Sequence, residues 1–279
     1  MVAPYVSVPL RWGVWAAPDS PITSLEDLDA GHGPIIFGIS RFGSGSHLMA
    51  TIMANARGWD PERVSFAKPC GSLDGLEAAV ASGAASLFMW NHSTTKPLAD
   101  AGRLRHVGDC FTPWPCFMIA VSRALLEHNR PALDAMLATI KDAARTFVAE
   151  GEASVDFVVK KHGIARQDAA DWFASVGYAE SNHIDDAVLS SAITALRATK
   201  IIDTVPARDD LVADLGPAVV VEGGHVIPPP SHWEYAPAED ESFTGLICAA
   251  ASPVYGLSWA EYEPSSPVAS SGSSFMAFM

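Results

Sequence analysis

The sequence predicts an α/β fold in which a parallel-rich sheet is followed by a mainly helical segment. Residues 35–39 form a short apolar run that passes through a Gly/Ser-rich turn into a segment with apolar residues at helical spacing. Residues 86–90 are a second apolar run, as expected for a strand buried on both faces. From residue 122 to residue 205 the pattern is helical. Strand, turn and helix in this order predict an α/β segment followed by a mainly helical segment.

The turn after the first strand is the first candidate binding element. It contains Ser44, Gly45, Ser46 and His47. Glycine lets the backbone turn tightly, the serines can cap the helix or donate hydrogen bonds, and the helix dipole favours a negative group at this end. The turn predicts either an anion site or a tight connection whose serines satisfy the NH groups of the helix. It matches neither the P-loop nor the dinucleotide-binding pattern, which favours a small solute.

Two further segments carry polar or aromatic residues to the ends of predicted strands, where α/β folds bind ligands. Trp90 closes the second strand, and Thr94 belongs to the donor-rich segment 91–97. Residues 104–107 predict another strand, followed by a loop in which prolines on both sides of Trp114 hold the backbone extended. Trp90 and Trp114 are therefore candidates for stacking on a flat ligand, with core packing as the alternative.

The rest of the chain predicts scaffold and tail. Residues 116–205 predict a return strand and four amphipathic helices. Residues 206–279 contain three consecutive prolines, scattered acids and a Ser-rich end. We expect this last segment to be a poorly ordered acidic tail.

The order of these motifs resembles the Ca3427-like branch of the type II periplasmic-binding-protein superfamily. That branch is similar to the solute-binding subunits of ABC transporters and to the thiamine-pyrimidine synthases. The resemblance covers roughly residues 5–200 and rests on residues 38–47, Gly58 and Trp59, residues 88–90, residues 94–97 and residues 112–115.

The resemblance implies a two-lobed α/β protein that closes on a small ligand. It makes eight residues candidates for the ligand site: Ser44, Gly45, Ser46, His47, Trp90, Thr94, Trp114 and Arg11. The Ser44 turn would form one face of the cleft, with Trp90 and Thr94 opposite. Trp114 and Arg11 would lie near the two crossovers between the lobes.

The resemblance also implies a domain organisation. Residues 1–33 would be a crossover and a remnant of lobe 1, residues 34–115 a complete α/β lobe 2, and residues 116–205 a mainly helical return to lobe 1, before the tail at 206–279. Type II binding proteins normally begin with a segment that builds most of lobe 1. This chain starts near the first crossover, so we expect half of the ligand shell to be absent.

Composition and charge exclude several classes of partner. The 279 residues are 49% hydrophobic, with a formal net charge of −14, which argues against nucleic acid and anionic membranes. No apolar run is long enough to span a membrane, and no secretory signal is visible, so we expect a cytoplasmic protein without membrane insertion. A transporter partner is not indicated by the sequence.

Neither a cofactor nor a metal is expected from the motifs. The four cysteines have no C-x-x-C spacing and read as reduced thiols. Cys110, Cys116, His47, His92 and His106 match no zinc pattern.

The sequence favours binding over catalysis. The Gly/Ser turn is not a nucleophile elbow, because His47 follows Ser46 too closely to be its base. Thiamine-pyrimidine synthases, as the resemblance has it, need a Cys-rich iron motif that this chain lacks. We predict non-catalytic binding of a small, anionic or heteroaromatic solute in an inter-lobe cleft. The alternatives are a pyrimidine-biosynthesis enzyme and a truncated fragment without function.

Overall fold

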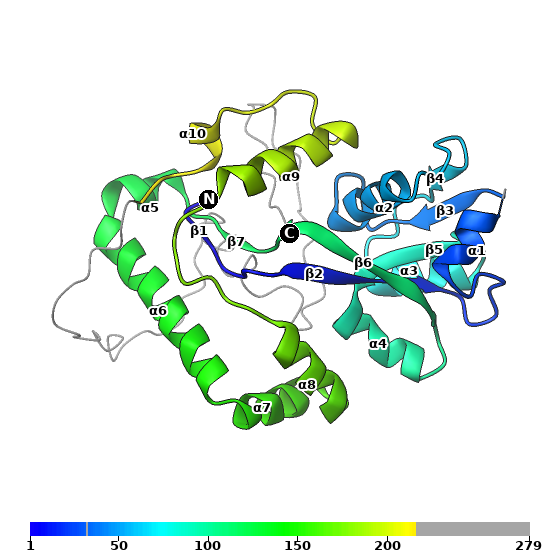
Figure 1. The fold of residues 1–279 in the computed structure, drawn as a ribbon, viewed down its shortest axis with the longest axis horizontal. Helices are drawn as coiled ribbons and strands as arrows, with labels where there is room; N and C mark the ends of the chain where they lie inside the picture. The colour runs from blue at the N-terminus through cyan, green and yellow to red at the C-terminus, as the bar shows by residue number, and fades with distance from the viewer. Residues whose placement is uncertain (32, 216–279) are drawn as a thin grey trace, which may run out of the picture.

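A five-stranded sheet forms the centre of one lobe in the computed structural model, which describes residues 1–31 and 33–215 (Figure 1). Its strands, in the order β4-β3-β5-β2-β6, are β4 (Val64–Phe66), β3 (Ile35–Gly38), β5 (Leu87–Asn91), β2 (Pro9–Ala16) and β6 (Arg105–Pro115). β3 is parallel to β4 and β5, whereas β2 is antiparallel to β5 and β6. The predicted α/β class with a parallel-rich sheet is confirmed, with β2 as the reversed strand.

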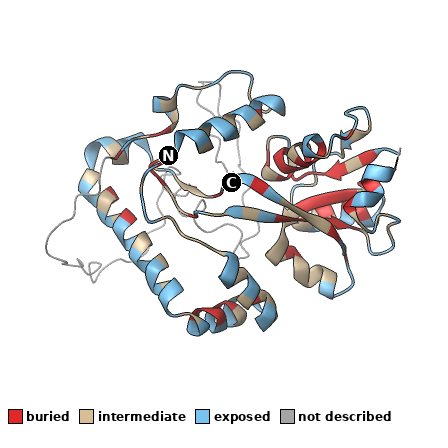
Figure 2. Cartoon of the chain, viewed as in Figure 1, coloured by how far each residue is buried: buried red, intermediate tan, exposed pale blue. Residues whose placement is uncertain are grey.

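Helices cover both faces of this sheet, and together they make the α/β lobe. α1 (Leu25–Ala30) and α2 (Gly45–Ala56) bury apolar residues such as Met49 against Phe37 on one face. α3 (Leu73–Ala81) and α4 (His92–Asp100) cover the other face, where Trp15 and Phe88 are fully buried. The buried residues are concentrated in this three-layer lobe (Figure 2).

The second lobe, the helical lobe, is built on a two-stranded sheet of β1 (Ala3–Pro4) and β7 (Met118–Ile119). Its helices are α5 (Arg123–His128), α6 (Arg130–Ala149), α7 (Glu152–His162), α8 (Arg166–Ser175), α9 (Asp186–Ala198) and α10 (Arg208–Leu211). α6 to α9 are the four helices that the periodicity predicts. Leu133 and Leu137 of α6 pack on Val2 and Ala3, and α9 leaves this lobe to contact α2 and β6.

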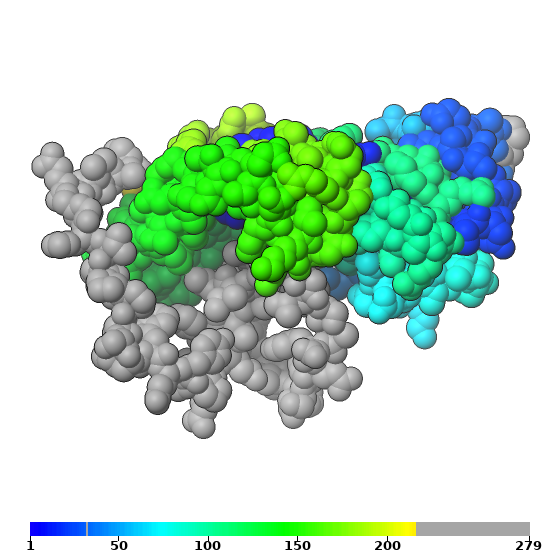
Figure 3. Space-filling model, turned by 90° about the horizontal axis from the view of Figure 1, so that it is seen from below, coloured from blue at the N-terminus to red at the C-terminus, as the bar shows by residue number. Residues whose placement is uncertain are grey.

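Three backbone segments lie side by side where the chain crosses between the lobes. Tyr5 N donates to Phe117 O at 2.8 Å, and Ala179 N donates to Tyr5 O at 3.0 Å. Val6 forms a bridge with Tyr178. The two lobes consequently sit next to one another, joined through this junction (Figure 3). The exact domain boundaries at 33/34, 115/116 and 205/206 stay a prediction.

The structure differs from the sequence prediction around Trp114. The segment expected to be a loop belongs to β6, which pairs with β2 as far as Pro9 and Pro115. β6 is an edge strand, and Pro113 and Pro115 are tolerated there because an edge strand needs fewer ladder donors. The return strand expected from residue 116 is correspondingly reduced to the two residues of β7.

The predicted tail, residues 206–279, lies outside the described residues from position 216 onward. Among the described residues, no helix has the length and apolar content needed to cross a lipid bilayer.

Candidate functional site

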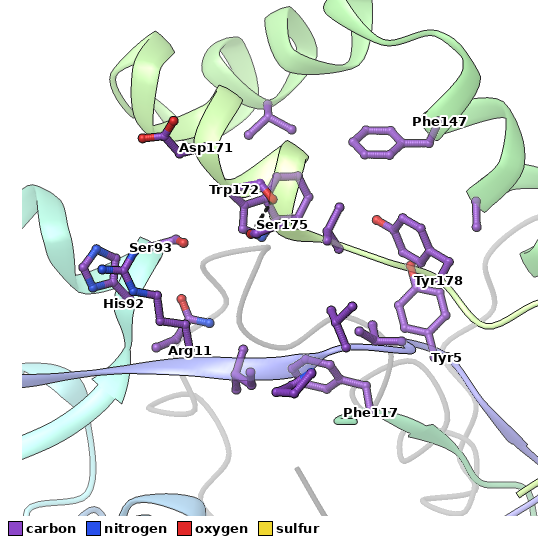
Figure 4. Close-up of a pocket in the computed structure, with 18 of the residues that line it drawn as sticks. Tyr5, Arg11, His92, Ser93, Phe117, Phe147, Asp171, Trp172, Ser175 and Tyr178 are labelled. Atoms are coloured by element: carbon purple, nitrogen blue, oxygen red, sulfur yellow. Dashed lines mark hydrogen bonds between the residues drawn. The ribbon is translucent and has the colours of Figure 1, made fainter. Parts of the chain in front are cut away.

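A cavity of about 1350 Å³ lies between the α/β lobe and the helical lobe (Figure 4). Its walls come from β2, α4 and β6 on one side and from α6, α7, α8 and the junction on the other. Ligand pockets for small molecules are usually about 300–1,000 Å³, so the cavity has room for a solute and its water. Its lining is mainly polar at the α/β lobe, whereas the helical lobe contributes aromatic side chains together with polar ones such as Asp168 and Asp171.

The polar end is organised by Asp109 of β6. Arg11 Nη2 of β2 lies 2.6 Å from Asp109 Oδ2, and His92 Nδ1 lies 2.9 Å from Asp109 Oδ1. His106 Nε2 lies 3.1 Å from the same Oδ1. Burial alone would raise the pKa of Asp109, but hydrogen bonds from His106, His92 and Arg11 outweigh it and hold the pKa well below its usual range. Asp109 is therefore a carboxylate that orients three cavity residues.

The start of α4 carries His92 and Ser93 to the cavity. The Asn91 side chain accepts from Thr94 N at 3.1 Å, which caps the helix at the end of β5. His92 and Ser93 are consequently the first residues of a helix that begins at the strand edge, and both line the cavity next to Arg11. Local capping thus determines where these two side chains stand.

An ion pair connects the two lobes beside the cavity. Lys96 Nζ of α4 lies 3.0 Å from Asp168 Oδ2 of α8, and both residues line the cavity. Hydrogen bonds to Asp100 and then to Asp168 raise the pKa of Lys96. The lysine is therefore charged when it bridges the lobes.

Aromatic side chains from distant parts of the chain form the opposite wall. The ring centroids of Tyr5 and Tyr178 are 5.4 Å apart, and those of Phe147 and Trp172 are 6.2 Å apart. Phe117 also lines the cavity and has a φ of 68°. A left-handed backbone is unusual for a bulky residue, and such residues concentrate at ligand sites and hinges. This aromatic wall suits a flat, apolar group.

Eight residues are predicted from the sequence. Within the part of the chain that the structure describes, only Arg11 of these eight lines the cavity. Ser44 and Ser46 are 2% exposed and bonded internally. Ser44 Oγ donates to Arg41 O at 2.7 Å, and Ser40 N donates to Ser46 Oγ at 3.0 Å. Gly45 lies against Trp12, where an added Cβ would be 2.9 Å from the ring. The serines therefore satisfy the turn itself, which is the structural alternative that the sequence left open.

The other predicted residues lie in three different places. His47 Nδ1 accepts from Gly43 N at 3.1 Å, and burial lowers the pKa of its imidazole. Trp90 packs against the core beneath α3 and α4, and Thr94 hydrogen-bonds Asn91. Trp114 lines a second, smaller hollow of about 350 Å³ between α2 and α9. A binding role for these residues and for Ser44 to Ser46 stays a prediction.

Ser46→Ala is expected to lower the free energy of unfolding by about 1–3 kcal/mol, because it leaves the buried Ser40 N–H without an acceptor. Chemical denaturation with an alanine replacement of the exposed Ser190 as the control measures this effect. A ligand-binding serine would show the opposite behaviour, with normal stability and weakened binding.

Most residues of the cavity are not predicted from the sequence. The donor-rich segment 91–97, which contains His92 and Lys96, is the local pattern that points to it. The sequence does not indicate that Phe147, Trp172 and Tyr178 line a cavity, because aromatic residues at such positions are equally expected in an ordinary helix core.

Comparison with known proteins places this geometry in a known fold. Residues 17–110 match the Ca3427-like PBP family. The structure resembles that of the Candida albicans CA3427 gene product, with a TM-score of 0.62 and 19% identity over 74% of this chain and 67% of that one. No curated protein sequence matches the chain.

Two bacterial binding proteins have the same fold. One is the ligand-binding component of an ABC-type import system from Staphylococcus aureus with zinc bound, with a TM-score of 0.59 and 14% identity over 76% of this chain and 72% of that one. The other is the alkanesulfonate-binding protein SsuA from Xanthomonas axonopodis pv. citri bound to MOPS, with a TM-score of 0.53 and 13% identity over 75% and 74% of the two chains. The chain therefore has the periplasmic-binding-protein fold, and its residues 17–110 carry the sequence pattern of the Ca3427-like family.

Proposed function

We propose that this protein binds a small solute with a flat, heteroaromatic or apolar part and a polar end, without chemical change, in the cavity between its lobes. The observation that carries the proposal is the division of one cavity into a polar end and an aromatic wall. The fold supports it, because the neighbours described above include two ligand-binding components.

Arg11 is the side chain best suited to hold the polar end of the solute. Its side chain is 47% exposed, and its Nη2 is held by Asp109. A guanidinium has five N–H donors, so donors remain for a carboxylate or carbonyl oxygen of the solute after Asp109 is bound. Ser93 at the start of α4 adds a hydroxyl beside it.

The fixed charges favour a heteroaromatic solute over a simple inorganic anion. The cationic side chains that line the cavity are Arg11 and Lys96, and the carboxylates are Asp109, Asp168 and Asp171. Two positive charges against three negative ones do not attract a free anion. The aromatic rings offer a larger gain, because a flat ring can stack on Trp172 or on the tyrosines.

A thermal melt of the purified chain with a panel of solutes tests the proposal. Heteroaromatic carboxylates, pyrimidines, alkyl sulfonates and inorganic phosphate are compared under one set of conditions. A solute at about 100 times its dissociation constant adds about 2.7 kcal/mol of stability. We expect a heteroaromatic class to raise the midpoint and inorganic phosphate to leave it unchanged. A cooperative transition that no class moves would contradict the proposal.

Lys96→Met is expected to shift the chain toward a more open arrangement of the lobes. The substitution keeps the apolar stem and removes the charge that pairs with Asp168. A partly exposed ion pair of this kind contributes about 1 kcal/mol or less, which corresponds to about a fivefold change in the ratio of closed to open molecules. Small-angle X-ray scattering should then give a larger radius of gyration.

Lys161→Met is the matched control, because Lys161 is an exposed residue of α7. An equal radius of gyration for both variants and the wild type would show that the Lys96–Asp168 pair does not hold the lobes together.

A further inference from the structure

A cluster of two imidazoles and one carboxylate lies at the polar end of the cavity. His92 Nδ1 and His106 Nε2 are 2.9 Å and 3.1 Å from Asp109 Oδ1. These three atoms all lie within 4.8 Å of one another. The side chains of His92, Asp109 and His106 are 12%, 21% and 37% exposed, and all three line the cavity. The cluster is therefore partly buried but accessible from the cavity.

A bulge in β6 brings the cluster together. His106 and Asp109 are three residues apart, and in a regular strand their side chains would lie on opposite faces. The pairing with β2 shifts at this point, since Val14 is opposite Gly108 and Trp15 is opposite His106. One extra residue in β6 therefore returns His106 to the face of Asp109. Bulges that redirect a side chain are frequent next to functional sites.

Surrounding groups hold the three side chains in place. The Trp15 ring is fully buried, and its centroid is 5.6 Å from the ring of His92 and 4.9 Å from that of His106. Arg11 binds Asp109 Oδ2 at 2.6 Å, which leaves Oδ1 for the two imidazoles. Metal-binding carboxylates are typically fixed by hydrogen-bonding outer partners, as Asp109 is by Arg11.

The geometry and the donor types fit a metal of the zinc class. Ligands about 2.0–2.1 Å from a tetrahedral ion lie about 3.3 Å from one another. The two distances to Asp109 Oδ1, 2.9 Å and 3.1 Å, fall short of that value by a few tenths of an ångström, and the two imidazole nitrogens lie within 4.8 Å of each other. Side-chain movements would therefore be enough to admit an ion. Two nitrogens and one oxygen suit zinc and its neighbours, whereas magnesium and calcium prefer oxygen ligands. No metal is predicted from the sequence, because the spacing of the cysteines and histidines matches no zinc pattern.

We propose that His92 Nδ1, His106 Nε2 and Asp109 Oδ1 bind a divalent transition-metal ion, with its remaining coordination position open to the cavity. Three protein ligands and one open position are typical of sites where the ion also binds a small molecule. The ion would reverse the excess of negative charge among the cavity residues. If the proposed function holds, it would thereby supply a partner for an acidic group of the solute.

Titration of the metal alone tests this proposal, and no solute is needed. The chain is treated with a chelator, dialysed and titrated calorimetrically with Zn²⁺, and Co²⁺ is then used as a spectroscopic probe. We expect the wild type to bind one equivalent of Zn²⁺. The affinity for Zn²⁺ should fall by about 100-fold or more in His106→Gln and in Asp109→Asn, since replacing an outer partner alone costs about 10–100-fold. His128→Gln, which changes an exposed histidine of α5, should bind as the wild type does.

Three results would overturn the metal site. The first is a wild-type chain that takes up no Zn²⁺. The second is a His106→Gln variant that folds and binds the ion with unchanged affinity. The third is a thiolate-to-cobalt charge-transfer band, which would place the ion on cysteine rather than on this cluster. The first and third results come from the wild type, so they stand even if a variant fails to fold.

The two proposals fail separately. Repeating the solute panel with a chelator present measures solute binding without the metal. A solute that stabilises the chelated protein while Zn²⁺ does not bind would keep the proposed function and remove the metal site.

Discussion

Replacing Gly13 by alanine is expected to lower the free energy of unfolding by about 3 kcal/mol, the upper part of the range for overpacked cores. A Cβ at this position would lie 2.4 Å from Cζ2 of Trp15. Trp15 is 0% exposed and lies on the central strand β2, so its ring has no free space to enter. Urea unfolding followed by circular dichroism measures the change.

Gly33→Ala is the matched control for this substitution. An added Cβ at Gly33 would meet nothing within 4 Å. We expect this control to unfold within about 0.5 kcal/mol of the wild type, or slightly later. Equal midpoints for Gly13→Ala and the wild type would show that the Trp15 ring can move. Trp15 would then not hold the rings of His92 and His106 in place.

The second large effect is expected on solute affinity. Once the panel has identified a solute, Trp172→Leu should weaken its binding by about tenfold, which corresponds to about 1.4 kcal/mol. Trp172 lines the cavity and leucine cannot stack on a flat ring. Trp172→Phe should retain most of the affinity. Isothermal titration calorimetry at matched protein stability provides the measurement.

Trp114→Leu makes this experiment decisive between two sites. Trp114 belongs to the hollow between α2 and α9, away from the cavity lining. If the solute occupies the cavity, Trp114→Leu leaves its affinity unchanged. The reverse pattern, with Trp114 important and Trp172 neutral, would favour the site predicted from sequence and contradict the one proposed from the structure.

The Gly/Ser turn shows why a local sequence pattern does not separate a structural role from a binding role. Its glycines, serines and following helix were readable in the sequence, and the helix begins at Gly45 as that pattern predicts. The same hydroxyl groups can serve a ligand or the turn. Only the three-dimensional contacts of Ser40, Ser44 and Ser46 show that these hydroxyls are used within the turn.

The sequence by itself determined the α/β class, the positions of β3, α2 and β5, and the helices from α6 to α9. These features depend on apolar periodicity and capping within about 20 residues, which a single chain displays directly. The resemblance to binding proteins also made Arg11 a cleft candidate; Arg11 lines the cavity, and its binding role stays a prediction.

Only the tertiary structure decided where the candidate site lies. The bulge that turns His106 toward Asp109 depends on pairing with β2, some 90 residues earlier in the chain. The aromatic wall combines Tyr5, Phe117, Phe147 and Trp172, whose sequence separation conceals that they face one cavity. These groups lie together because strands and helices from two lobes meet at the junction. Local sequence patterns do not predict such long-range contacts.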